Sequence, residues 1–225
     1  MDGDFILSSY GQILLIFAIL TSINQIIRPK NAGIRLYKNI TILSQIAPFL
    51  LLVIAFIIDD SSLKLVTEYG GADLPILYRI SAVWGGRAGP LLLFAALISI
   101  VTWFMTNKEE IDYDVRIMHG FTLGILFISW FLAPFEDSEG IIPSELNPLL
   151  QTDLMVIHPP IVFSYYALCI ATASVAMSGV IHQKSAKEIH DEQLHWARAA
   201  FLIGTIGIGL GGLWAYTVLD WGGYW

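Results

Sequence analysis

A histidine followed by two prolines is the residue pattern here that could most readily do chemistry. His158-Pro159-Pro160 stands next to a long apolar run. Proline is tolerated in the first turn of a helix, because its missing N–H would have no partner there. We therefore predict that the prolines mark the start of a helix, with His158 held just before it at the membrane surface. A neutral imidazole there could ligate iron or carry a proton, or it could form only a local hydrogen bond.

Two short motifs combine tryptophan with paired glycines. The first is Trp84-Gly85-Gly86, and the second is a terminal stretch over residues 212–225. The terminal stretch holds Trp214, Trp221, Gly222, Gly223, Tyr224 and Trp225. Aromatic rings offer flat apolar faces, and glycine lets the backbone approach such a face closely because it has no side chain. The motifs would suit a large planar apolar ligand. Alternatively, they form the aromatic belt that most membrane proteins place at headgroup level.

The remaining histidines and the cysteine carry weaker signals. His119 lies in an apolar run, where we expect it to form a hydrogen bond within the helix bundle. His182, His190 and His195 lie in a charged segment that we expect to be a solvated hairpin, and their spacing fits no metal-binding pattern. The single cysteine, Cys169, excludes an internal disulfide, a CxxC pair and a cysteine zinc site.

The elements that position these residues must cross a membrane. Of 225 residues, 56% are hydrophobic and 14% are charged, whereas soluble domains have about a quarter of their residues charged. A helix needs about 20 mostly apolar residues to cross the hydrocarbon core. Six stretches meet that length, so we predict an all-α polytopic membrane protein with one membrane domain over residues 1–225. The predicted spans are residues 5–27, 40–58, 88–107, 117–135, 160–181 and 199–219.

Positive charge is divided unevenly between the predicted loops. One set of loops holds Arg28, Lys30, Arg35, Lys38, Lys108, Arg116, Lys184, Lys187 and Arg198. The other set holds Lys64, Arg79 and Arg87. Loops rich in Lys and Arg stay in the cytoplasm, so we expect both termini, His158 and the tryptophan motifs on the outer side of the cell membrane. The net charge of −7 and the lack of a basic cluster exclude a nucleic-acid partner.

The last predicted span carries small residues at helical spacing. Gly207 and Gly211 form a GxxxG pattern. Such a pattern lets another helix pack closely, either within this chain or from a partner.

Four motifs in order make the sequence similar to the CcmF family, the haem lyase subunits of System I cytochrome c maturation. They are Trp84-Gly85-Gly86 with the leucines after it, Leu146-Asn147-Pro148-Leu149-Leu150-Gln151, His158-Pro159-Pro160, and the opening of a tryptophan-rich WWD domain at residues 212–225. The family pattern continues beyond Trp225. The resemblance therefore implies the N-terminal part of such a lyase, in split or truncated form.

The resemblance also implies a site and a chemistry. His158 matches an axial haem ligand on the outer face, and the tryptophans, glycines and tyrosine of residues 214–225 named above match the first half of the surface that cradles haem. The family joins haem vinyl groups to the thiols of an apocytochrome CxxCH motif, so no nucleophile is expected in this chain. The implied cofactor is haem, either b-type or the haem that is transferred. The implied partners are the C-terminal half of the lyase, a CcmE-type haem carrier, a CcmH-type chaperone and apocytochrome c.

Two other functions stay open on the sequence. One is a non-enzymatic haem-export or haem-carrier subunit of the CcmC or CcsA type, which shares the WWD domain. The other is a structural membrane subunit whose tryptophans only form a belt.

Overall fold

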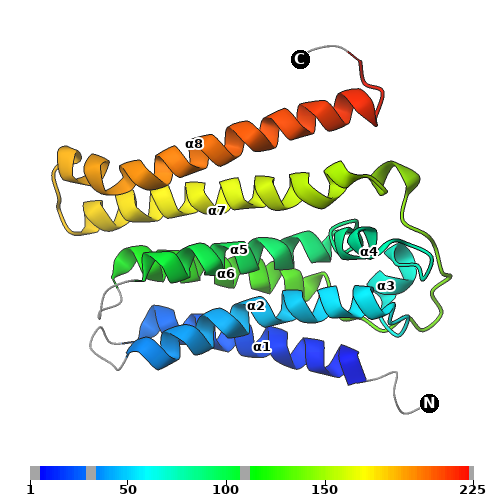
Figure 1. Cartoon of the computed structure of the whole chain (residues 1–225). Helices are drawn as coiled ribbons and strands as arrows, with labels where there is room; N and C mark the ends of the chain where they lie inside the picture. The colour runs from blue at the N-terminus through cyan, green and yellow to red at the C-terminus, as the bar shows by residue number, and fades with distance from the viewer. Residues whose placement is uncertain (1–5, 29–33, 107–111, 223–225) are drawn as a thin grey trace.

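The computed structural model describes residues 6–28, 34–106 and 112–222, and this part of the chain is helical apart from its loops. Its six long helices lie roughly side by side in an elongated bundle (Figure 1). They are α1 (Ile6–Ile27), α2 (Ile34–Ile58), α5 (Ala88–Met105), α6 (Tyr113–Phe131), α7 (Asp153–Ile181) and α8 (Ala186–Thr217). Within the described residues, the prediction of an all-α fold is confirmed.

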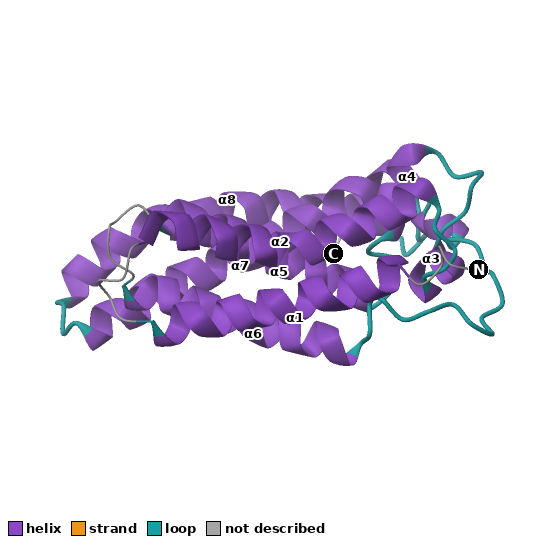
Figure 2. Ribbon diagram, turned by 90° about the horizontal axis from the view of Figure 1, so that it is seen from below, coloured by secondary structure: helices purple, strands orange, loops and turns teal. Residues whose placement is uncertain are grey.

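Three short elements gather at one end of the bundle, which we call the site end. They are α3 (Lys64–Tyr69), α4 (Ile76–Ala82) and the 3-10 turn η1 (Pro148–Leu150). Figure 2 shows α3, α4 and the long loops together at this end. α1 begins and α8 ends at the site end as well (Figure 1). The side of the membrane on which the two termini lie stays a prediction.

Within the described residues, five of the long helices are long and apolar enough to cross a membrane. They are most of α1 and α2 and the whole of α5, α7 and α8. α6 forms close to the predicted fourth span but carries Asp114, Arg116 and His119 in its first two turns, and it is not among the five. The chain is a polytopic membrane protein, and six crossings stay a prediction.

The start of α7 corrects one prediction. The prolines do not begin the helix: Thr152 is its N-cap and accepts the backbone N–H of Met155, so Pro159 and Pro160 lie inside it. The hydroxyl of Tyr78 on α4 donates to the carboxylate of Asp153, 3.3 Å away, in the first turn. Burial and this carboxylate raise the pKa of Tyr78, so its hydroxyl stays protonated and can donate. A capping threonine and an acidic first turn start the helix nearly two turns earlier than the prolines suggest.

The start of α8 corrects a second prediction, the start of the last span. The charged segment after α7 is helical from Ala186, well before residue 199 where the last span was predicted to start, although most of its side chains are exposed, as expected of a solvated segment. Ser185 and Glu188 form a capping box, in which each side chain bonds the backbone N–H of the other residue. The loop between the two helices shrinks to residues 182–185, and α7 and α8 form a tight antiparallel hairpin (Figure 1).

The core of the bundle lies between α1, α2, α5 and α6. Its fully buried side chains include Leu15, Leu52, Leu92, Leu126 and Phe135. α7 packs against α5 and α6, whereas α8 packs mainly against α7 and lies at the edge of the bundle (Figure 1). The site is therefore built where the α7–α8 hairpin meets the loop before α5.

Candidate functional site

His158 lies in the second turn of α7 and is fixed by α8. Its Nδ1 is 3.1 Å from the backbone carbonyl oxygen of Gly207. A carbonyl can only accept a hydrogen bond, so Nδ1 carries the proton in the neutral ring. The lone pair is then on Nε2, the form in which histidine binds metals.

The glycines of α8 make this contact possible. A Cβ at position 211 would lie 2.8 Å from Cε1 of His158, and one at position 204 would lie 2.7 Å from the ring of Tyr165. A Cβ at Gly209 or Gly212 would meet nothing within 4 Å. The GxxxG face therefore packs against α7 within this chain.

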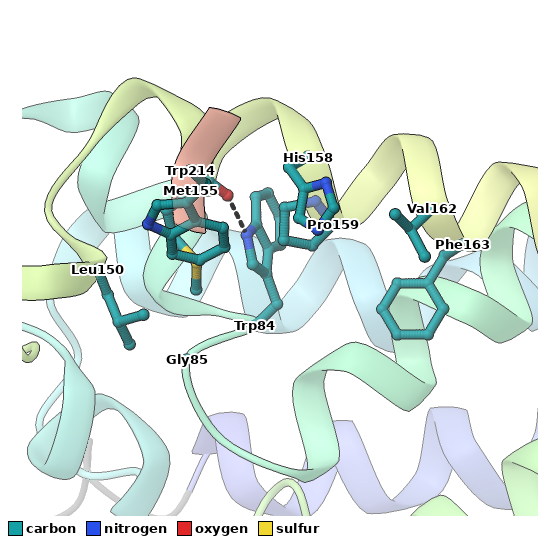
Figure 3. A pocket seen from close by; sticks show the side chains of 9 residues that line it. All are labelled: Trp84, Gly85, Leu150, Met155, His158, Pro159, Val162, Phe163 and Trp214. Carbon is teal, nitrogen blue, oxygen red and sulfur yellow. Dashed lines mark hydrogen bonds between the residues drawn. The ribbon is translucent and has the colours of Figure 1, made fainter. Parts of the chain in front are cut away.

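His158 lines a cavity of about 360 Å³ at the site end of the bundle (Figure 3). The other lining residues are Trp84, Gly85, Leu150, Met155, Pro159, Val162, Phe163 and Trp214. The ring of Trp214 meets that of His158 edge to face, with the ring centroids 5.7 Å apart. Nε1 of Trp214 is buried and has no hydrogen-bond partner within the part of the chain described. The cavity is thus mostly apolar and aromatic, with one imidazole on its wall.

Trp84 forms part of the wall from the loop between α4 and α5. It is only 8% exposed, and its Nε1 donates to the backbone carbonyl of Met155 at 2.7 Å (Figure 3). This tryptophan is therefore not part of an aromatic belt. Trp103 and Trp130 lie exposed on α5 and α6, as belt residues do.

The structure brings together two of the residues predicted for the site, His158 and Trp214. Trp221 is 68% exposed and does not line the cavity. Gly222 follows the end of α8 with a left-handed backbone, φ +59°. Gly223, Tyr224 and Trp225 lie outside the described residues.

Met155 and Phe163 line the cavity, and the sequence reasoning missed them. They stand three residues before and five after His158, on the face of α7 that also carries Pro159. Residues four apart share a helix face, so Met155, Pro159 and Phe163 form one row. With the helix start placed at Asp153, this spacing would have put both residues on the row of Pro159.

A second, more polar cavity of about 640 Å³ lies at the same end. Its wall includes Glu68, Arg87, Ser144 and Glu145, and it shares Leu150 with the first cavity. The two cavities are therefore neighbours, one apolar and one polar.

The fold and the site together define a helical membrane protein that presents one oriented histidine to an aromatic cavity. The chain belongs to the cytochrome c assembly protein family, whose sequence pattern matches residues 84–225. It is 34% identical to the cytochrome c-type biogenesis protein CcmF of Escherichia coli K12, over 86% of this chain and 32% of that protein. It is 32% identical to the cytochrome c-type biogenesis protein NrfE of Haemophilus influenzae, over 78% of this chain and 29% of that protein.

A solved structure has the same fold. The structure of a cytochrome c haem lyase CcmF matches 99% of this chain and 37% of its own length, with a TM-score of 0.71 and 19% sequence identity. The chain thus spans about a third of the length of these relatives. The resemblance to the CcmF family is confirmed.

Proposed function

We propose that this chain is part of a cytochrome c haem lyase and that it holds haem at the site end of the bundle through His158. The observation that carries the proposal is the hydrogen bond from Nδ1 of His158 to the Gly207 carbonyl. Metal-binding histidines usually donate their second ring N–H to a carbonyl or carboxylate, which fixes the tautomer and the ring plane. His158 has this arrangement beside an aromatic cavity.

The residues present fit a haem group. Nε2 of His158 would hold the haem iron, and Trp84, Phe163 and Trp214 would supply apolar surface next to the haem. His158 is the histidine that would hold the iron, since His119, His182, His190 and His195 do not line the cavity.

Bound haem would supply the vinyl groups that react with the apocytochrome thiols. This chain would orient the ring, exclude water from its apolar face and tune the iron through His158. The substrate brings the thiols, so the chain needs no nucleophile of its own. The neighbouring polar cavity, with Arg87 on its wall, offers an approach for the polypeptide.

The proposed partners follow from the length and family of the chain. The remaining two thirds of a lyase, as the relatives possess it, would complete the haem site. A CcmE-type carrier would deliver haem, and a CcmH-type chaperone would present apocytochrome c. The site end would face the outer side of the cell membrane.

The test replaces His158. We expect His158→Ala, expressed with the remaining part of the lyase, to lose haem absorbance and cytochrome c maturation while the protein still inserts and binds its partner. Added imidazole should restore part of the activity by occupying the vacant iron position. His190→Ala, at the opposite end of the bundle, is the control and should behave as wild type. Normal maturation in His158→Ala would contradict the ligand role.

The second candidate is a non-enzymatic haem carrier, which the same histidine and cavity would also serve. A reconstituted system separates the two functions. Covalent cytochrome c formed only when this chain is present supports the lyase, whereas haem binding without any covalent product supports the carrier.

A further inference from the structure

The paired prolines interrupt the hydrogen-bond ladder of α7 next to His158. In an α-helix the N–H of each residue bonds the carbonyl four residues earlier. Pro159 has no N–H, so the carbonyl of Met155 loses its partner inside the helix. The interruption falls within the turn that carries His158.

Trp84 supplies the missing bond from another part of the chain. Its indole Nε1 donates to the Met155 carbonyl at 2.7 Å, across 71 residues of sequence, and the bond is buried. Both groups line the cavity that His158 lines (Figure 3). The indole N–H thus takes the place of the N–H that Pro159 lacks.

The loop that carries Trp84 is itself held rigidly. The backbone N–H of Trp84 bonds the carbonyl of Ser81 at 3.1 Å, and that of Gly85 bonds the carbonyl of Ala82 at 2.9 Å. Gly89 packs directly on the Val83 carbonyl, where any side chain would clash. The position of Trp84 is therefore set by α4 and by the start of α5, and it can hold α7 in place.

We infer that Trp84 is a positioning residue for His158: its indole N–H replaces the helical hydrogen bond that Pro159 removes and fixes the turn of α7 that presents the imidazole. The consequence of this positioning for haem binding rests on the proposed function. The contact itself does not depend on any ligand.

A rescue experiment tests the hydrogen bond. Trp84→Phe keeps an aromatic ring but removes the N–H, and Pro159→Ala returns a helical N–H to the Met155 carbonyl. In the 225-residue chain in nanodiscs, we expect Trp84→Phe to raise amide hydrogen exchange at Ile157 and His158 by about tenfold, because the turn loses a buried bond. The double variant Trp84→Phe/Pro159→Ala should exchange close to the wild-type rate.

The control is Trp130→Phe, which changes an exposed tryptophan on α6 and should leave the exchange unchanged. Loss of ring volume alone would affect Trp84→Phe and the double variant equally. Equal exchange in these two variants, or wild-type exchange in Trp84→Phe, would therefore overturn the inference.

A second readout separates this inference from the proposed function. With the remaining part of the lyase present, Trp84→Phe should shift the haem absorbance spectrum from six-coordinate towards five-coordinate, and the double variant should reverse the shift. An unchanged spectrum in Trp84→Phe would overturn the effect on the ligand. If wild type binds no haem, the proposed function fails, while the exchange result still decides the positioning role.

Discussion

At the scale of single residues, the site depends on two glycines of α8 that lie beside His158. Gly207 contributes a carbonyl that orients His158, and Gly211 contributes empty space beside the ring. Both stand on the face of α8 that meets α7, whereas Gly209 faces away. A histidine ligand must be held in one tautomer and one orientation.

Gly211→Ala should therefore damage the site. The new Cβ would lie 2.8 Å from Cε1 of His158, so the ring or the helix must move and the bond to Gly207 should weaken. We expect weaker haem binding and a lower yield of cytochrome c, measured by absorbance in the assembled complex. Gly209→Ala is the matched control: its Cβ meets nothing within 4 Å, and alanine favours a helix by up to about 1 kcal/mol over glycine. Equal haem binding by the two variants would show that the ring has room to move.

At the scale of helices, buried polar side chains tie the bundle together. Gln45 on α2 is 1% exposed, and its Nε2 donates to Ser22 Oγ on α1 at 2.8 Å. The same Nε2 lies 3.1 Å from Nδ1 of His119 on α6, so the expected bond of His119 within the bundle is confirmed. Nearby, Gln25 on α1 donates to Thr41 on α2. In a bilayer the hydrophobic effect does not hold helices together, so such bonds contribute to their association.

Gln45→Leu should loosen the contact between α1, α2 and α6. Hydrogen bonds of this kind contribute about 0.6 kcal/mol on average and up to about 1.7 kcal/mol in membrane proteins, and Gln45 makes two contacts. We expect a loss of roughly 1–2 kcal/mol in the free energy of unfolding, measured by denaturant titration in mixed micelles. Thr205→Val, which removes only a bond to its own helix, is the control and should be close to neutral. A similar loss of unfolding free energy in both variants would mean that the bonds of Gln45 between helices contribute no more than a bond within one helix.

At the scale of the whole molecule, the bundle has two different ends. The site end holds α3, α4 and the long loops, whereas the other end holds the short α7–α8 turn. The basic residues Arg28, Arg116 and Lys184 lie towards the latter end, near the breaks between helices. The uneven charge predicts that this end faces the cytoplasm.

Cysteine labelling tests this orientation, and the single native cysteine makes the background simple. In a Cys169→Ser chain, we expect Ser144→Cys to react with a membrane-impermeant maleimide added to intact cells. Gln183→Cys, in the α7–α8 turn, should react only after the membrane is opened. Labelling of Gln183→Cys, or of the segment around Arg28, from the outside would reverse the predicted topology.

The sequence by itself determined the all-helical membrane class and the approximate place of the apolar part of each long helix, and it singled out His158 as a candidate. These features are local: a continuous apolar run makes a helix wherever it occurs in lipid, because the backbone has no other partner there. Local sequence signals also predicted the wrong start for α7 and for α8. The prolines at 159 and 160 suggested a boundary, but the capping side chains of Thr152 and Ser185 placed the starts of α7 and α8 earlier.

Only the tertiary structure decided which groups meet. The sequence singled out Trp84, Trp214 and His158 separately, but it could not show that one cavity joins them. The GxxxG pattern predicted a close helix neighbour, and the fold supplied α7 with His158 against it. The bond from Trp84 to Met155 has no sequence signal, because a backbone carbonyl accepts from any donor and the donor stands 71 residues away. Such pairings depend on how helices pack in three dimensions, which periodicity along one helix does not encode.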